Sequence, residues 1–147
     1  MQALESRQRW MSVLAHSRPE QLRSHWQALN LSPGYRSIRA PEIGLAQLQG
    51  RMGATGRRFV LGDMTVTRAV VQLDNGGYGY SYIAGRDKAH AELCALADAL
   101  LQQPEHGERL QQQLIAPLAA LQHEQRQLRA RAIAASRVDF FTLVRGD

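Results

Sequence analysis

Residues 69–82 read AVVQLDNGGYGYSY, and this stretch decides the fold class. Asn75-Gly76 is a strong short-range hairpin signal, because both residues tolerate the positive φ of a type I′ turn. With a two-residue loop Asp74 faces Gly77, and the residues on either side pair as antiparallel strands. This register predicts that three tyrosines share one face with apolar residues of the preceding strand, as the pairs Leu73/Tyr78, Val71/Tyr80 and Ala69/Tyr82.

The shared face of the three tyrosines has two interpretations. The commoner one is that the rings cover a core while the hydroxyls reach water. The alternative is a stacking platform for nucleic-acid bases, but such platforms carry basic residues among the aromatics, and this strand has none. The opposite face carries Gly77, Gly79 and Ser81, and these small residues predict the close approach of a helix or another backbone.

Further strands are predicted upstream of the hairpin. Residues 45–52 alternate between two faces, a glycine-rich interruption follows at 53–56, and residues 57–61 resume the extended pattern. Gly62-Asp63 is predicted to turn the chain again before the hairpin. Together these segments predict an antiparallel sheet of about four strands.

Helices are predicted on both sides of the sheet. Two amphipathic segments, 4–16 and 19–29, precede it. Asp87 is placed to cap a helix over 88–103, and Pro117 is expected to open a last helix running to about Ser136. The sequence therefore predicts an α+β fold, with N-terminal and C-terminal helices and one domain over residues 1–147.

The two N-terminal helices also allow a DNA-binding interpretation, since a helix, a short turn and a helix lie close to basic residues. The second helix offers only Gln21, Ser24, His25 and Gln27 as base-contacting side chains, which is a thin set. We therefore favour a two-helix cap over the sheet.

The composition bounds the class of protein. The apolar fraction is 44% and no apolar run approaches the roughly 20 residues of a membrane span. The N-terminus is charged where a signal peptide would be apolar, and Cys94 is a lone cysteine, so we expect a cytoplasmic protein. The net charge is +5, and the basic side chains are almost all arginine, with Lys88 the only lysine. This balance suits nucleic acid, an anionic nucleotide or an acidic partner subunit without choosing among them.

No strong catalytic motif is present in the sequence: it contains no Walker-type loop, dinucleotide fingerprint, HExxH or GxSxG. The nearest anion-binding candidate is the stretch 53–58, whose loop amides and the guanidiniums of Arg57 and Arg58 can hold a phosphate. A glycine turn flanked by exposed arginines is the commoner explanation. We predict no catalytic residue on this chain.

His90 and Cys94 lie four residues apart and face the same side of their predicted helix, together with Asp87 and Asp98. Such a set can bind a transition metal. A solvated or interface-facing polar edge is the commoner arrangement, and the lone cysteine has no CxxC partner. We predict no metal site.

Four ordered stretches resemble a known family, the G subunit of the bacterial carbon–phosphorus lyase core complex. The resemblance covers essentially the whole chain. The matching stretches are RWMSVLAH at 9–16, RMGATG at 51–56 with LGD and TVTR after it, GYSY at 79–82 with GRD at 85–87, and ASRVDFFTLVRGD at 135–147.

The resemblance implies a subunit without its own active site. It implies partners, namely the H, I, J and K subunits, and functionally the L protein. It also implies a reaction of the assembly, in which methylphosphonate displaces adenine from MgATP to give α-D-ribose 1-methylphosphonate 5-triphosphate in phosphonate catabolism. No cofactor is expected on this chain, since MgATP is a substrate of the complex. The alternative from the residues alone is a basic nucleic-acid-binding or regulatory module.

Two groups of residues are candidates for interface or anion contacts. The first contains basic residues expected around loops at the edges of the sheet: Arg57, Arg58, Arg68, Arg86 and Lys88. The second is the apolar C-terminal run 138–144, which includes Phe140 and Phe141 and reads as a strand with two faces to bury. Because an exposed run of this kind is an aggregation hazard, we expect a partner to cover it.

Overall fold

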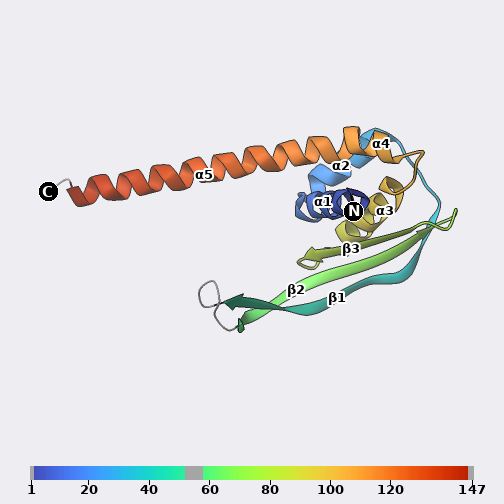
Figure 1. Cartoon of the computed structure of the whole chain (residues 1–147), viewed down its shortest axis with the longest axis horizontal. Helices are drawn as coiled ribbons and strands as arrows, with labels where there is room; N and C mark the ends of the chain where they lie inside the picture. Colours follow the sequence, from blue (N-terminus) through green and yellow to red (C-terminus); the bar gives the residue numbers. More distant parts are fainter. Residues whose placement is uncertain (1, 52–57, 146–147) are drawn as a thin grey trace.

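The computed structural model describes the backbone of residues 2–51 and 58–145, and side chains over 4–47 and 62–136. A three-stranded antiparallel sheet of order β1-β2-β3 lies against a layer of helices (Figure 1). The α+β prediction is thus confirmed. The elements, in chain order, are α1 (Gln2–His16), α2 (Pro19–Leu29), β1 (Tyr35–Arg51), β2 (Arg58–Leu73), β3 (Tyr78–Ala84), α3 (Lys88–Leu101), α4 (Gly107–Leu110), the π-helical turn η1 (Gln111–Ile115) and α5 (Ala116–Arg145).

The hairpin between β2 and β3 forms where predicted, but its loop has three residues. Leu73 N donates to Gly77 O at 2.7 Å, and Gly76 N donates to Leu73 O at 2.9 Å. Only Gly76 within the loop takes a positive φ, of 100°, so Asn75 avoids the left-handed region. The predicted register was therefore wrong by one residue, and this shift moves the tyrosines to the other face of the sheet.

The strands are fewer and longer than predicted. The segment from Arg58 runs through Gly62 into the same strand, so Gly62-Asp63 is not a turn. A bulge absorbs the extra residue there, because Leu48 pairs with Gly62 while Gln49 pairs with Val60. Further register shifts between Ser37 and Glu42 accommodate Pro41, which cannot donate to a ladder. A bulge therefore replaces the turn predicted at Gly62-Asp63.

The face of small residues packs against α3, as predicted for a closely approaching helix. A Cβ on Gly79 would collide with the Ala95 carbonyl oxygen and lie 2.7 Å from Ala99 N. Ser81 Oγ donates to Ala91 O at 2.6 Å. The core is built from this contact: the buried side chains on the sheet side include Ala69, Val71, Leu73 and Ile83, and those on α3 include Ala91, Ala95, Leu96 and Leu100.

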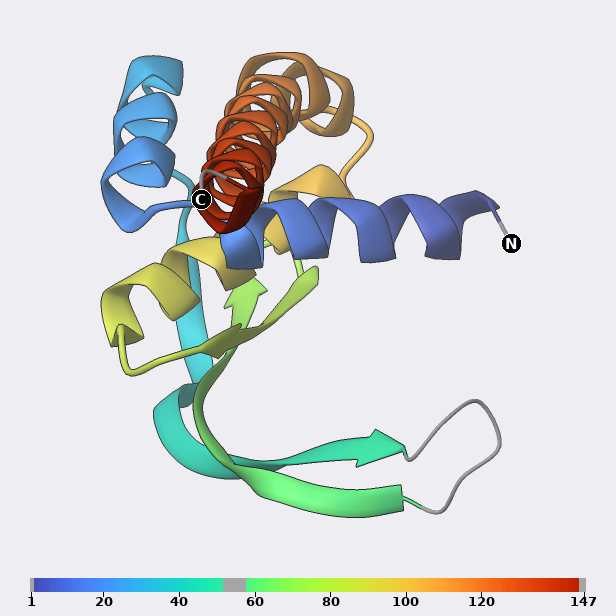
Figure 2. The same cartoon turned by 90° about the vertical axis from the view of Figure 1, so that its left-hand side faces the viewer.

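The N-terminal helix α1 packs against α3 and the β3 edge of the sheet, and α2 packs against η1. Trp10 and Leu14 of α1 and Leu22 and Leu29 of α2 are all buried in the common core. Figure 2 shows α3 nearest to β3, with α1 beside it and α2 and the start of α5 farther from the sheet. The prediction of a two-helix cap over the sheet therefore holds only for α1, which reaches β3, whereas α2 uses its apolar stripe to pack within the helical layer.

The last helical stretch runs from Gly107 to Arg145 through η1. Within this stretch α5 begins at Ala116, so Pro117 lies in its first turn as predicted, and the helix continues from the π turn without a break. The C-terminal run was predicted as a strand, and this was wrong, because its backbone continues α5 as far as Arg145. A helix satisfies its own N–H and C=O groups, whereas a lone terminal strand needs a neighbouring strand to do so.

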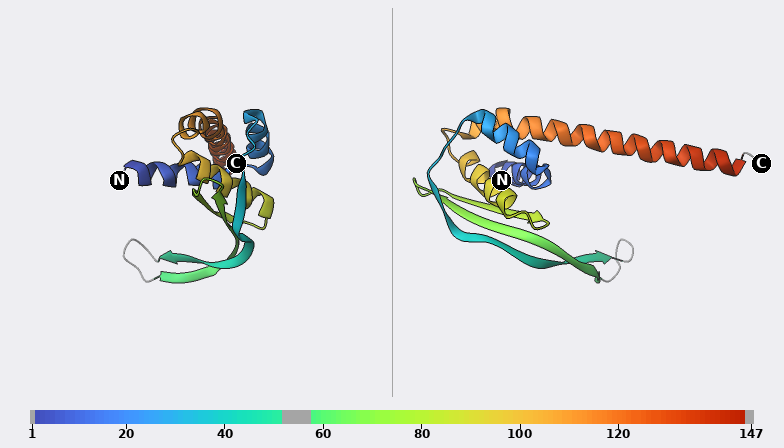
Figure 3. Two further views of the ribbon diagram at one scale, coloured as in Figure 1. Left: turned by 90° about the vertical axis from the view of Figure 1, so that its right-hand side faces the viewer. Right: turned by 180° about the vertical axis from the view of Figure 1, so that it is seen from behind.

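Two arms project from the body toward the same side of the molecule. One is the distal part of the β1–β2 hairpin, and the other is α5 (Figure 1; Figure 3, right). Every side chain of 126–136 is exposed, so this part of α5 has left the packed body. The hairpin arm also swings to one side of the sheet (Figure 2). Such arms add exposed surface without adding core.

Candidate functional site

The outer face of the sheet carries the three tyrosines. Tyr78, Tyr80 and Tyr82 are 45–50% exposed and point away from α3. The interpretation that they cover the chain's own core is therefore wrong. We call this surface the tyrosine face, defined by the three tyrosines and the residues paired with them across β2 and β1.

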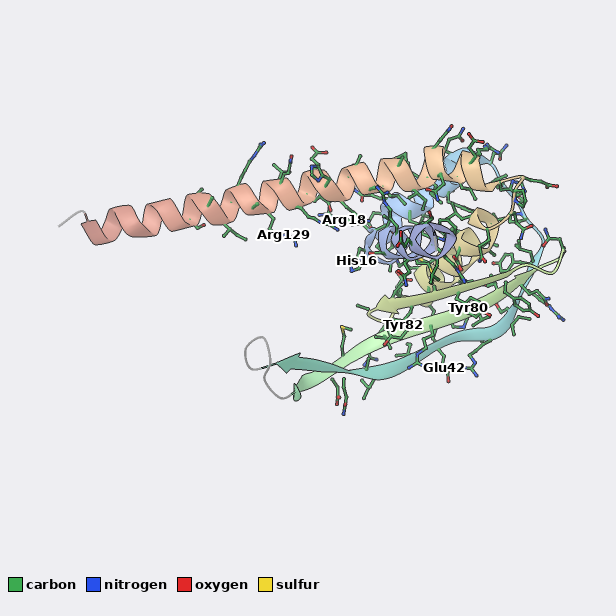
Figure 4. All side chains as sticks on the ribbon, viewed as in Figure 1. His16, Arg18, Glu42, Tyr80, Tyr82 and Arg129 are labelled. Atoms are coloured by element: carbon green, nitrogen blue, oxygen red, sulfur yellow. The ribbon has the colours of Figure 1, made fainter. Side chains whose placement is uncertain are left out.

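Arginines from other elements surround the tyrosines. Register pairing makes three rows across the sheet: Tyr78–Gln72–Arg36, Tyr80–Val70–Arg39 and Tyr82–Arg68–Glu42. The Arg68 guanidinium lies 5.5 Å from the centre of the Tyr82 ring, and that of Arg7 lies 5.4 Å from the Tyr80 ring. Figure 4 labels Tyr80, Tyr82 and Glu42 on the sheet. Tyrosine with arginine is the composition enriched at the energetic centres of protein interfaces.

Of these arginines only Arg68 is a candidate from the sequence, because Arg7, Arg36 and Arg39 lie on segments far from β3 in the chain. Arg36 and Arg39 lie on β1, 39–46 positions before the tyrosines, and Arg7 comes from α1. Strand pairing and helix packing bring them together. Residues 36–40 show the alternation of a strand, with Arg36, Ile38 and Ala40 on one face and Ser37 and Arg39 on the other. The register shifts near Pro41 interrupt this alternation, so the sequence does not show which residues share a face of the sheet.

Asp98 holds α1 against the edge of the sheet. Its side chain is fully buried and accepts from Arg7 Nη2 at 2.9 Å, from Trp10 Nε1 at 2.8 Å and from the Tyr80 amide at 3.0 Å. These bonds join α1, α3 and β3 at one carboxylate. The hydrogen bond to Asp98 raises the pKa of Arg7, so the guanidinium stays protonated. Asp98 is thus a structural residue of the tyrosine face, since it anchors both Arg7 and Tyr80.

His90 and Cys94 are buried on the side of α3 that faces α1. Cys94 Sγ lies 3.7 Å from His90 Nε2. Burial raises the pKa of the Cys94 thiol to about 12 and lowers the pKa of His90. No group of three or more His, Cys, Asp or Glu side chains comes together among the residues with described side chains. A thiol with this pKa is a poor nucleophile and a poor ligand.

The candidate basic residues are spread over the molecule. Arg68 lies on the tyrosine face, whereas Arg86 and Lys88 are exposed at the turn between β3 and α3. Arg57, with residues 53–56 of the candidate phosphate loop, lies outside the described residues. The backbone of Arg58 begins β2, and its side chain is not described. The structure therefore brings only Arg68 into the tyrosine surface.

The two arms add apolar side chains to the exposed surface. On the β1–β2 hairpin Ile43 and Leu45 are exposed, Leu45 by 67%, and on α5 Leu128 and Ile133 are each 56% exposed. Phe140 and Phe141 follow on α5, but their side chains lie outside the description. Exposed apolar groups at such positions are typical of surfaces that a partner covers.

The fold and its surface define a class of protein: an α+β interaction subunit with a small packed body, an aromatic and basic sheet face, and two projecting arms. Within residues 2–51 and 58–145, no helix has both the length and the apolar character that a membrane span requires.

The comparisons with known proteins identify the family. A family model described as "Phosphonate metabolism protein PhnG" matches residues 5–146. A curated relative from Rhizobium meliloti (strain 1021) is 41% identical over 144 residues, covering 96% of this chain and 90% of the relative. That relative is named alpha-D-ribose 1-methylphosphonate 5-triphosphate synthase subunit PhnG. The chain belongs to the PhnG family.

Proposed function

We propose that this chain is an accessory, non-catalytic subunit of a bacterial carbon–phosphorus lyase core complex, acting in the cytoplasm. The complex displaces adenine from MgATP with methylphosphonate, giving α-D-ribose 1-methylphosphonate 5-triphosphate. The relative's name supports the synthase assignment, since it is itself named as a subunit. Family membership does not favour the alternative of a nucleic-acid-binding or regulatory module.

The tyrosine face is the single observation that carries the interaction role. It combines three half-exposed tyrosines with four arginines, Arg7, Arg36, Arg39 and Arg68. Glu42 is the one carboxylate in the three described rows. A surface of this composition favours a protein partner with an acidic patch, because arginine forks bind carboxylates in pairs of hydrogen bonds.

We assign the partners as the H, I, J and K subunits, with the L protein acting on the same pathway. MgATP is a substrate of the assembled enzyme, and this chain holds no cofactor of its own. The two arms extend the surface beyond the body, and this shape suits a subunit that contacts more than one neighbour. Arg86 and Lys88, at the turn before α3, are candidates for further charge-assisted contacts.

Assembly tests this proposal. The chain is co-expressed with the H, I, J and K subunits and recovered through a tag on the I subunit. Arg68→Glu and the double variant Tyr80→Ala/Tyr82→Ala are expected to lower recovery at least about tenfold, because central interface residues are typically worth 2 kcal/mol or more.

Arg23→Glu is the charge-matched control, since Arg23 is exposed on α2 away from the sheet, and it should be recovered normally. Failure of the unaltered chain to be recovered would contradict the subunit role itself. Normal recovery of both tyrosine-face variants would leave the subunit role intact and move the interface to another surface.

A further inference from the structure

A small recess lies where α5 leaves the helical body, beside the end of α1. It has a volume of about 180 Å³ and is lined by His16 of α1 and by Gln122, Gln125, Arg126 and Arg129 of α5. We call it the basic recess. Figure 4 shows His16 and Arg129 on the same side of α5. None of these residues belongs to the tyrosine face.

The basic recess offers hydrogen-bond donors and positive charge. Each lining side chain carries N–H donors, and no carboxylate lines it. Neither Arg126 nor Arg129 forms an ion pair with any side chain described over 4–47 and 62–136. Glu124 is the nearest acidic residue along α5, but at about 100° per residue it points about 140–200° away from both arginines.

The recess is held in shape by contacts between α1 and α5. Gln122 Nε2 donates to Val13 O at 2.7 Å, and this bond fixes the first turns of α5 against α1. His16 Nδ1 donates to Ser12 O at 2.8 Å, which orients the ring and leaves Nε2 free of that bond. Arg126 and Arg129 are three residues apart and therefore on one side of the helix.

We propose that the basic recess binds a phosphate-class oxyanion, either free or as part of a polyphosphate chain. Two guanidiniums on one helix face offer planar forks that match phosphate oxygens. The volume equals about six water molecules, enough for a tetrahedral oxyanion. The proposal stands on the donors and their placement and does not depend on the subunit role.

Calorimetric titration of the full chain with inorganic tripolyphosphate at low salt tests the site. One anion is expected to bind per chain, more weakly as salt is added. Arg126→Gln and Arg129→Gln are each expected to weaken binding about tenfold, since a charge-assisted hydrogen bond is worth about 1.5 kcal/mol or more.

Arg131→Gln is the matched control, because it removes the same charge from the same helix but points about 140–200° away. It should change affinity less than about twofold, since only a remote charge is lost. All three arginines are exposed, so their variants should fold normally. Equal weakening by all three would mean diffuse attraction to a cationic chain and would overturn the site, as would the absence of saturable binding.

Titration with inorganic phosphate and with acetate separates the possible sources of the anion. Binding of phosphate alone at comparable strength identifies a single-phosphoryl site, and much tighter tripolyphosphate binding identifies a polyphosphate site; both support the proposal. Acetate that binds as well as phosphate would identify a general carboxylate-binding surface, such as one for an acidic protein segment, and would overturn it.

Discussion

At the scale of single residues, Asp98 joins three elements that are far apart in the sequence. Its carboxylate is fully buried and accepts from Arg7, Trp10 and the Tyr80 amide. A buried carboxylate is costly to desolvate, and here the cost is offset because donors surround it. The same bonds place Arg7 over Tyr80, so a core residue determines part of the tyrosine face.

Asp98→Asn should therefore destabilise the chain by about 3 kcal/mol, because it leaves the Arg7 guanidinium facing a neutral amide in a mostly buried site. The free energy of unfolding in urea measures this. Asp63→Asn, at an exposed carboxylate of β2, is the control and should change stability by less than about 0.5 kcal/mol. Equal stability of both variants would mean that the Asp98 bonds contribute little.

At the scale of elements, the distance between α3 and the sheet depends on Gly79. The hypothetical Cβ at Gly79 meets backbone atoms of α3, which cannot rotate away as a side chain would. Gly79→Ala should push α3 off β3 and lower the free energy of unfolding by about 1–3 kcal/mol, as overpacking typically does.

Gly44→Ala is the matched control for this packing prediction. Gly44 lies on β1, and the nearest atom to its hypothetical Cβ is Arg68 Nη2 at 4.0 Å, so there is room for a methyl group. Chemical denaturation of the two variants should separate them clearly. If Gly79→Ala is as stable as the parent chain, α3 does not require the close approach.

The second element with a separable role is α5. Its beginning is part of the core, since Leu118 is 1% exposed, whereas all side chains over 126–136 are exposed. Ending the chain after Gln127 should therefore change Tm by less than about 3 °C, because the side chains described beyond it, 128–136, are all exposed. Leu118→Ala, in contrast, should cost about 2–5 kcal/mol.

The truncated chain also tests whether α5 is an arm for partners, because it should lose recovery with the other lyase subunits. The truncation also removes Phe140 and Phe141. That these two residues contact a partner stays a prediction, now for residues of a helix instead of a strand. A large fall in Tm on truncation would mean that the distal part of α5 packs on the chain's own body.

At the scale of the whole molecule, packed and exposed surfaces are separated. The body buries one continuous core from all its helices and from β2 and β3, while the sheet's outer face and both arms leave aromatic and aliphatic side chains exposed. A molecule of this shape has a small core relative to its surface area. We therefore expect part of its exposed apolar surface to be buried against partner subunits in an assembly.

Accordingly, the purified chain alone should release no adenine from MgATP in the presence of methylphosphonate, because the proposed role is accessory. Chromatographic detection of free adenine is the measurement, and the co-purified complex supplemented with the L protein provides the positive control. Release that follows the concentration of the isolated chain through successive purification steps would contradict the accessory role.

The fold class followed from local signals that act within a few residues. The Asn75-Gly76 turn, the cap at Asp87 and the small residues of β3 predicted the hairpin, the start of α3 and the close contact between them, and the Asp87 side chain indeed accepts from His90 N at 3.0 Å. The resemblance carried by the four ordered stretches also sufficed to name the family. These features depend on backbone geometry and residue type, which the sequence specifies directly.

The interaction surface was decided by the tertiary structure. Asp-Asn-Gly-Gly is compatible with a two-residue or a three-residue loop, and packing on α3 selects the register that buries Val71 and exposes the tyrosines. Arg7, Arg36, Arg39 and Arg68 come together only when α1 and β1 are in place. Likewise, the basic recess joins His16 to Arg129 across 113 positions of sequence. Non-local contacts of this kind depend on the packing of the whole core, and no periodicity within a single segment specifies them.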